Sequence, residues 1–348
     1  MGARRPLAPA RAERPQESAV IVRLISLASP ADWETALTRV PHGPAHTHWY
    51  NAALSLSVED EIALIAYASP PDWAACPIVL RRHGESIDIA IPYGIGGFAI
   101  CGECKELPDA IRRFAGEQRW VCGYLAVHPL SRHPFSAEDG LEWGENGLER
   151  GPLVYRLDLS MSEPHLFASM HATNRYEIRR DEALLSSVIT DAAAIGRALP
   201  ELYEQTRARV GASDAYRFFR ATLAAWLSSP GCLALGLGDP LQAVVICTHA
   251  ASVADYFINA STDEGRKYTR ILIWAAMREL KRLGIRYFNL GGGVRDGDTL
   301  DAFKRRFGGE LTVRPILKQV YCRDRFVELC AQAGAMERAG SYFPPYRQ

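Results

Sequence analysis

The sequence predicts a mixed α/β protein made of two tandem units, each a mixed sheet flanked by helices. Three observations lead to this prediction. The chain has 348 residues, 48% of them hydrophobic, which is enough for two domains with separate cores. The C-terminal half reads as three strands, a helix and a further strand. The N-terminal half reads in the same order.

In the C-terminal half, three runs of β-type composition at 233–238, 241–250 and 253–261 predict an antiparallel meander. The segment 268–284, YTRILIWAAMRELKRLG, has apolar residues at helical spacing and ends in a basic turn and a glycine. IRYFNL, 285–290, then predicts a strand. A strand reached through a helical crossover pairs in parallel with its neighbour.

In the N-terminal half, the meander is predicted at 61–67, 76–83 and 86–93, the helix at 105–117 and the last strand at 120–127. The two halves are offset by about 170 residues and share no residue-level identity, so the repeat is one of topology. This unit is similar to the GNAT acyltransferase fold, although topology alone assigns no function.

The chain divides into four expected segments. Residues 1–18, rich in Arg, Pro and Ala, predict a disordered tail without the apolar region of a signal peptide. The first GNAT-like domain is expected over 19–160, the second over 161–330 and a C-terminal tail over 331–348. We expect a cleft between the two domains.

Composition sets further bounds. No apolar run approaches the roughly 18 residues of a membrane span. Eight irregularly placed cysteines favour a reducing compartment, with the cytoplasm as default. Forty basic and forty acidic residues exclude a general nucleic-acid coat, but residues 261–325 hold fifteen Lys or Arg against eight Asp or Glu. This end of the chain is suited to a phosphate-bearing partner.

A metal site is not expected. Cys101 and Cys104 form a CxxC, but no second pair follows at zinc-ligand spacing. His42, His46 and His48 lie close in sequence without a carboxylate or cysteine nearby.

Seven short motifs occur in an order that extends over most of residues 45 to 325: PYGIGGF (92–98), YLAVHPL (124–130), NRYEIRR (174–180), LYEQTRARVGA (202–212), YFINAST (256–262), FNLGGG (288–293) and LDAFKRRFGG (300–309). This ordered set resembles the Fem-type aminoacyltransferases and their FemAB/FemX-like relatives, which have two GNAT-like domains. The chain departs from the best-known members in lacking a long charged helical arm and in having a glycine triplet where they carry a Tyr-Gly turn.

The resemblance implies transfer of an amino acid from aminoacyl-tRNA to an amine of a peptide, usually in a peptidoglycan precursor, by direct attack and without a tightly bound cofactor. One alternative is a GNAT N-acetyltransferase that uses acyl-CoA and acts on an amino sugar or a natural-product intermediate. A second is an inactive GNAT-like binding module. The transferred group, the acceptor, the general base and the oligomeric state are left open.

Lys304 is the main catalytic candidate. Helical spacing puts Leu300, Phe303 and Phe307 on one face with Lys304 at its edge, so its stem can follow the core while its ammonium enters a cleft. A cation there would stabilise the negative charge that develops in acyl transfer, and the resembled family has a corresponding lysine.

Two carboxylates and one arginine accompany it. Asp298 is predicted as the N-cap of the Lys304 helix. Asp301 lies in the first turn, where the helix dipole stabilises a carboxylate. Either is also a candidate general base. Arg305 is expected to contact the substrate.

Donor binding is expected at two segments. Arg266, Lys267 and Arg270 crowd the start of a helix, where anions bind, although the glycine-rich pyrophosphate loop of CoA-dependent GNAT enzymes is absent. Gly291, Gly292 and Gly293 match neither GxGxxG nor GxxxxGK[ST], so we interpret them as the wall of a narrow channel.

For the acceptor, Arg175 and Arg179 lie one helical turn apart, a spacing suited to one phosphate or carboxylate of a nucleotide-linked substrate. Salt bridges to Glu177 or Asp181 are the alternative. Further acceptor-binding candidates are Tyr93, Gly94, Gly96 and Tyr256. His128 is expected to be structural rather than a catalytic base.

Overall fold

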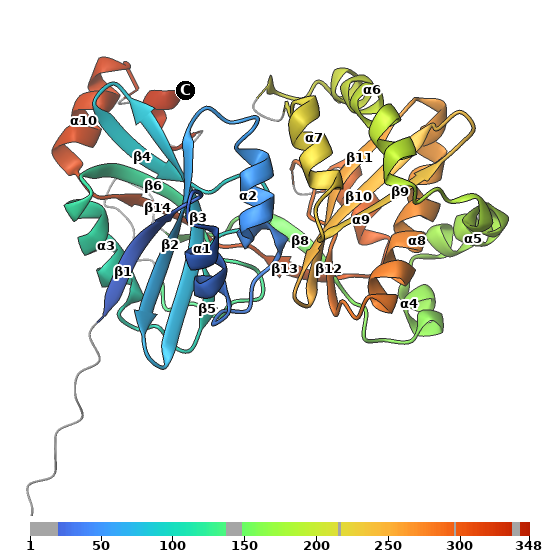
Figure 1. The fold of residues 1–348 in the computed structure, drawn as a ribbon, viewed down its shortest axis with the longest axis horizontal. Coiled ribbons are helices and arrows are strands. Elements are labelled where there is room, and N and C mark those ends of the chain that lie inside the picture. The colour runs from blue at the N-terminus through green and yellow to red at the C-terminus, as the bar shows by residue number, and fades with distance from the viewer. Residues whose placement is uncertain (1–19, 137–147, 215–216, 296, 336–341) are drawn as a thin grey trace, which may run out of the picture.

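Two sheets organise the protein into two lobes that lie side by side in the computed structural model (Figure 1). The structure describes residues 20–136, 148–214, 217–295, 297–335 and 342–348. The tail expected over 1–18 lies outside these residues. Among the helices that the structure describes, none is long and apolar enough to cross a bilayer.

The first sheet has the order β1-β2-β3-β4-β6-β14-β7, with β5 paired to β3. Its strands are β1 (Ile21–Ser26), β2 (Glu61–Ser69), β3 (Asp72–His83), β4 (Ser86–Ala90), β5 (Ala99–Cys101), β6 (Trp120–Ala126), β7 (Leu148–Glu149) and β14 (Ile316–Val320). The second sheet has the order β13-β8-β12-β11-β10-β9. Its strands are β8 (Leu153–Asp158), β9 (Cys232–Leu237), β10 (Ala243–Ala250), β11 (Val253–Ser261), β12 (Tyr287–Asn289) and β13 (Glu310–Val313).

The expected repeat is confirmed in both sheets. β2, β3 and β4 form an antiparallel meander, α3 (Leu107–Glu117) crosses over, and β6 pairs with β4 in parallel. In the second sheet, β9, β10 and β11 form the meander, α8 (Thr269–Arg282) crosses over, and β12 pairs with β11 in parallel. The mixed α/β fold class follows from this repeat. Each crossover helix buries the apolar face that its periodicity predicts.

The remaining α-helices are α1 (Pro30–Leu37), α2 (His48–Leu54), α4 (Glu163–Ser169), α5 (Ala172–Arg180), α6 (Ala192–Val210), α7 (Arg220–Leu227), α9 (Thr299–Arg305) and α10 (Arg323–Gln332). One buried cluster joins the lobes, because α2 of the first packs against α7 of the second, and the Tyr50 ring of α2 lies 5.4 Å from the Phe257 ring of β11. In it, Trp226 Nε1 donates to the Tyr50 carbonyl oxygen at 3.1 Å, and the Trp226 and Phe257 rings lie 4.6 Å apart.

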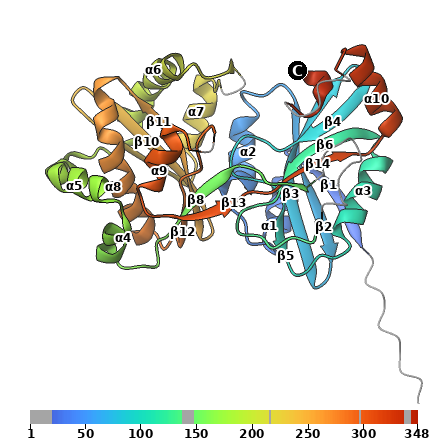
Figure 2. The ribbon, with the colours of Figure 1, turned by 180° about the vertical axis from the view of Figure 1, so that it is seen from behind.

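Two strands belong to a different sheet from the rest of the domain in which the boundaries expected at 160 and 330 would place them. β8 belongs to the second sheet, where it lies between β12 and β13. β14 returns to the first sheet and pairs with β6, and Figure 2 shows α10 in that lobe, where it packs on β6. The 3-10 helix Pro345–Arg347 is also fixed there, because the buried Asp88 carboxylate accepts hydrogen bonds from Tyr346 and Arg347 at 3.1 and 2.6 Å. The segment expected as a C-terminal tail therefore has described residues packed on the first lobe.

Candidate active site

The Lys304 helix α9 begins at a well-formed cap. Asp298 Oδ1 accepts from the Asp301 amide at 2.7 Å, as the predicted N-cap requires. Its Oδ2 accepts from the amides of Val294 and Arg295 at 2.8 and 3.0 Å. These hydrogen bonds lower the pKa of Asp298. Asp298 is thus a fixed anion that holds the preceding loop against the helix start.

The Lys304 side chain is 9% exposed. Its Nζ donates to the Gly292 carbonyl oxygen at 2.7 Å and lies 5.8 Å from the centre of the Tyr256 ring. Burial lowers the pKa of Lys304 to about 8, against the opposing influence of Asp298 and Asp301. Lys304 is therefore a poorly hydrated cation at neutral pH. Its pKa is close enough to neutral pH for the side chain to exchange a proton.

The chain at the glycine triplet passes very close to neighbouring atoms, which explains why side chains are absent there. Gly291 has φ +68°, and a Cβ there would lie 3.1 Å from Lys304 Nζ. A Cβ on Gly292 would meet the Leu153 carbonyl oxygen at 1.9 Å, and one on Gly293 would meet Asp298 Oδ1 at 2.4 Å. The three glycines therefore let the chain pass between β8, the lysine and the helix cap.

A groove of about 1300 Å³ lies beside Lys304, between the C-terminal end of α6, β11, the start of α8 and α9. Tyr256 and Phe303, which adjoin Lys304, line it. Its other lining residues include five cations, namely Arg209, Arg266, Lys267, Arg270 and Arg306, and two acids, Asp263 and Asp298. The structure thus brings the three expected donor-binding cations together with Tyr256 and Asp298.

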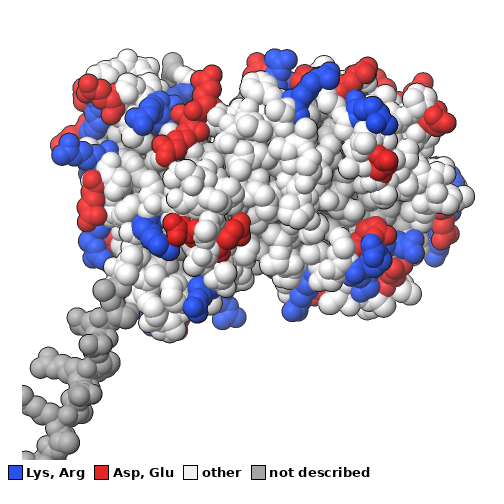
Figure 3. Space-filling model, viewed as in Figure 1, with Lys and Arg blue, Asp and Glu red and all other residues white. Residues whose placement is uncertain are grey.

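The groove cations differ in how far they are engaged. Arg270 forms an ion pair with Glu177, and Arg209 Nη1 lies 3.5 Å from Asp263 Oδ1. Arg266 and Arg306 are exposed and form no ion pair with a residue that the structure describes. The molecule as a whole is neutral, and acidic and basic side chains intermingle on the face shown in Figure 3. The excess of positive charge in the groove is therefore local.

Arg209 and Arg306 were missed as site residues. Both lie inside two of the seven motifs, LYEQTRARVGA and LDAFKRRFGG, but only the packing of α6 and α9 around one groove identifies them.

Arg175 and Arg179 both contact the C-terminal end of α4. Arg175 donates to the carbonyl oxygens of Ala168 and Met170 at the end of α4, and the Arg179 guanidinium lies 5.0 Å from the centre of the Phe167 ring. The alternative salt bridges are also absent from the described residues, since Glu177 pairs with Arg270 and Asp181 with Arg180. The two arginines thus link α5 to α4, and their role in acceptor binding remains a prediction.

Asp301 and Arg305 form a pair behind Lys304. Arg305 donates to the Asp301 carboxylate and to the Tyr155 hydroxyl, the latter at 3.0 Å. The Tyr155 hydroxyl also donates to Asp301 at 2.8 Å. Asp301 is 1% exposed. Both partners of this pair hold α9 on β8.

Tyr93, Gly94 and Gly96 lie at the contact between the lobes and do not line the groove. The Tyr93 carbonyl accepts from the Tyr50 hydroxyl at 2.9 Å, and its ring lies 5.0 Å from that of Phe218. Gly94 has φ +114°, and the Gly96 carbonyl accepts from Arg314 at 3.2 Å. Their role as acceptor-binding residues remains a prediction.

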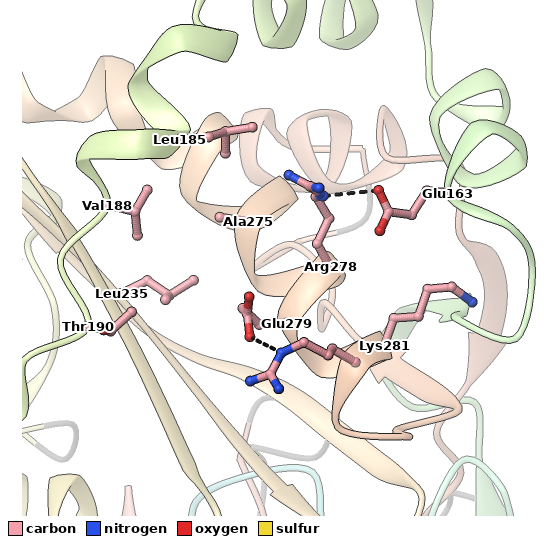
Figure 4. Close-up of a pocket in the computed structure, with 10 residues that line it drawn as sticks. Glu163, Leu185, Val188, Thr190, Leu235, Ala275, Arg278, Glu279 and Lys281 are labelled. Carbon is pink, nitrogen blue, oxygen red and sulfur yellow. Dashed lines mark hydrogen bonds and ion pairs between the residues drawn. The ribbon is translucent and has the colours of Figure 1, made fainter.

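A second hollow, of about 640 Å³, lies between α8, β9 and the chain before α6 (Figure 4). Its charged side chains are paired among themselves, Arg278 with Glu163 at 3.0 Å and Arg282 with Glu279 at 2.9 Å. Lys281, which also lines it, donates to the Leu159 carbonyl oxygen at 2.8 Å. This hollow contains none of the expected site residues.

The histidine cluster is divided by the fold. His46 Nε2 bonds the Gly97 carbonyl at 2.8 Å, whereas His48 Nε2 bonds that of Leu27 at 2.8 Å. Within the described ranges, no group of three His, Cys, Asp or Glu side chains is placed to hold a metal ion.

Comparison with known proteins supports the fold and the domain. Residues 168–305 match the family model described as an acetyltransferase (GNAT) domain. The structure of FemX is similar, with 13% identity, coverage of 88% of this chain and 99% of that chain, and a TM-score of 0.64. The C-terminal domain of a putative lysylphosphatidylglycerol synthetase from Agrobacterium fabrum is similar as well, with 15% identity, coverage of 88% and 97%, and a TM-score of 0.53. No curated protein sequence matches the chain.

The matched segment contains β9 to β12, α8 and Lys304. Apart from Arg306, the residues that line the groove fall within the segment that matches the acetyltransferase (GNAT) model, and this match supports the expectation of an acyltransferase. The expected similarity to FemX-like tandem GNAT proteins is confirmed at the level of the fold.

Proposed function

We propose that this chain, an acyltransferase of tandem GNAT fold, moves an aminoacyl group from aminoacyl-tRNA to an amine of a peptide or cell-wall-precursor-like acceptor. The observation that carries the proposal is the buried Lys304 ammonium beside a groove with an excess of positive charge. Similarity of fold to FemX, and to the domain of a putative lysylphosphatidylglycerol synthetase, supports this class of donor.

The chemistry follows from the position of the lysine. Attack by an amine on the donor carbonyl places negative charge on the carbonyl oxygen and then on the departing ribose oxygen. A fixed cation in a poorly hydrated site stabilises the charge on both oxygens, and the site need not reorganise during the reaction. With a pKa of about 8, Lys304 can also give a proton to the leaving oxygen.

The donor's phosphates would lie along Arg266, Lys267 and Arg306. Arg266 and Lys267 stand in the 3-10 helix Glu264–Tyr268, directly before α8, where the helix dipole adds to their attraction for an anion. These side chains are exposed and so can reach a large ligand as readily as a small one.

Acyl-CoA is the second candidate donor, and the match of the Lys304 domain to an acetyltransferase model favours it. Its phosphates would use the same cations. The leaving atom would then be a sulfur, which carries negative charge more easily than a ribose oxygen and needs less help from Lys304.

Mass spectrometry decides between the donors. Candidate acceptors, including peptidoglycan precursors and simple peptides, are incubated with the protein and either aminoacyl-tRNA or acyl-CoA. A gain in acceptor mass with aminoacyl-tRNA supports the primary proposal, and a gain only with acyl-CoA overturns it. If a pathway that needs the protein runs unchanged with Lys304→Ala, the chain is instead an inactive binding module. We place the activity in the cytoplasm, in keeping with eight cysteines that are all free.

A further inference from the structure

The second sheet divides next to Lys304. β11 and β12 pair only through Val253, Ala254 and Asp255, the last of which is opposite Asn289. Beyond this row the chain after β12 bonds to β8 instead, with the Leu290 amide donating to the Tyr155 carbonyl at 2.8 Å. In the described part of the chain, no backbone ladder joins the rest of β11 to residues 290–293. The opening therefore begins at Asp255 and Asn289.

A row of polar side chains crosses the sheet at this point. Asp255 lies directly opposite Thr248 on β10 and Asn289 on β12, so the three share one face. All three are buried. Asp255 Oδ1 accepts from Asn289 Nδ2 at 2.8 Å, while Asn289 Oδ1 and Thr248 Oγ1 have no hydrogen-bond partner among the described residues.

This face is turned away from Lys304. Successive side chains of a strand alternate, so Tyr256, against which Lys304 lies, points to the opposite side from Asp255. A donor carbonyl lodged in the opening would have the lysine on one side and the carboxylate on the other.

The first lobe completes the polar surroundings. His128, just after β6, is buried. Gly43 lies close to both His128 and the start of β11, because a Cβ added to it would be 3.0 Å from His128 Nε2 and 3.6 Å from Val253. Arg314, just before β14, acts electrostatically on Asp255. His128 Nε2 and Arg314 Nε are buried without partners in the described structure. Buried polar atoms are normally satisfied, so unpartnered ones on both sides of this contact indicate a place for a polar ligand.

The two carboxylates first considered as bases are already engaged. Asp298 accepts three backbone hydrogen bonds, and Asp301 is held by Tyr155 and Arg305. Burial raises the pKa of Asp255 to about 7, although Asn289 and Arg314 oppose the rise. Two neighbouring titratable groups are Tyr50 of α2 and Cys247 of β10; burial raises the pKa of both, and Asp255 adds to the rise.

We propose that Asp255 is the general base of the acyl transfer and that Thr248, Asp255 and Asn289 hold the acceptor amine. This inference rests on the function proposed above. The amine nitrogen uses its lone pair to form the C–N bond with the donor carbonyl carbon, and Asp255 takes the proton that this nitrogen loses. The bond from the carbonyl carbon to the leaving oxygen or sulfur breaks, the electron pair goes to that atom, and Lys304 protonates it. Proton exchange with solvent then restores both side chains.

The test uses the full-length protein, ethylamine as the acceptor probe and whichever donor the wild type consumes. Asp255→Asn keeps the size of the side chain and a hydrogen bond to Asn289 but cannot take a proton. We expect kcat to fall at least about 100-fold with unchanged donor affinity. The wild type should also show an additional loss of rate below about pH 7, as Asp255 becomes protonated, that the variant lacks. Thr248→Val should raise the KM for ethylamine about tenfold and leave kcat within about twofold.

Folding of the variant is checked by urea unfolding. The pKa of Asp255 lies above its unfolded value of about 3.9, so the wild type loses stability as pH rises from about 4 to about 7. Asp255→Asn removes this loss and should be at least as stable as the wild type at pH 8. A less stable variant is replaced by Asp255→Glu, which should retain the rate loss below neutral pH.

Two results would overturn the inference. One is transfer by folded Asp255→Asn at the wild-type rate with an unchanged pH profile, which leaves the proposed function intact. The other is independent of turnover. Saturation-transfer NMR should detect ethylamine bound to the wild type and give a clearly weaker signal with Thr248→Val, and equal signals from both proteins would contradict the proposed amine site. Failure of the wild type to transfer from any donor would instead count against the proposed function.

Discussion

Lys304 Nζ donates to the carbonyl oxygen of Gly292 at 2.7 Å, across twelve residues of chain. The bond joins the last turn of α9 to the glycine triplet that follows β12. Asp298, the cap of the same helix, holds the intervening loop through two further amides. The position of the ammonium thus depends on the backbone of the triplet as well as on the helix, and the predictions below test each part.

The pH dependence of stability tests the burial of Lys304. Its pKa of about 8 in the folded protein lies below the unfolded value of about 10.4, so the wild type gains stability as pH rises from about 8 to about 10. Lys304→Met removes the buried charge and should stabilise the protein by about 1 to 2 kcal/mol at pH 7. The advantage should shrink by pH 10. Urea unfolding at the two pH values measures it, and an advantage independent of pH would mean that the ammonium is well solvated.

Gly291→Ala tests the close approach of the triplet. The substitution costs roughly 1 to 2 kcal/mol because φ is +68°, and its Cβ would lie 3.1 Å from Lys304 Nζ. Gly284→Ala is the matched control, since φ is +79° there and nothing lies within 4 Å of the Cβ. We expect similar losses of stability from both and a loss of activity from Gly291→Ala alone. Equal activities would show that the lysine tolerates displacement.

Asp298→Ala tests the cap. Loss of an N-cap destabilises a helix by about 1 kcal/mol. Because α9 has only seven residues, this loss should disturb the position of Lys304. We expect a fall in kcat, because Lys304 is displaced, and no weakening of donor binding, because the groove cations stay in place and one groove acid is removed. Asp298→Ser, which retains a capping oxygen, should recover most of the activity. If it does not, the carboxylate has a role beyond capping.

The donor-binding cations are tested by Arg266→Ala with Lys267→Ala. We expect the KM for the donor to rise about tenfold or more, with kcat within about twofold, since these side chains contact phosphate rather than the reacting atoms. The dependence of donor affinity on salt concentration should also weaken. Arg278→Ala with Arg282→Ala, which line the second hollow rather than the groove, is the control. An equal effect from the control pair would mean that charge acts over the whole domain and not at the groove.

Local patterns were sufficient to predict the two meanders, the helices α3 and α8, and the parallel strands that follow them, because each element carries its own periodicity. Helical spacing also located Lys304 at the edge of an apolar face, and Asp298 was recognisable as a cap. The short strand β14 was not foreseen, since nothing in ILKQV tells to which sheet it returns. That return shifts the domain boundaries.

Long-range contacts explain the remaining differences. The spacing of Arg175 and Arg179 was read correctly as one face of a helix, but their actual partners, the end of α4 and the ring of Phe167, come from another element. Arg209 and Arg306 meet only through the packing of α6 and α9. Asp255 looks like an ordinary strand residue until the pairing of β10, β11 and β12 places it in a buried polar row.

The most direct test of the central claim is single-turnover acyl transfer by the wild type, Lys304→Met and Lys281→Met, with acceptor mass as the readout. Lys281 is a matched control because its ammonium also donates to a backbone carbonyl, at 2.8 Å, but outside the groove. The account predicts transfer at similar rates by the wild type and Lys281→Met, and a rate at least about 100-fold lower for Lys304→Met. Transfer by Lys304→Met at the wild-type rate would contradict it.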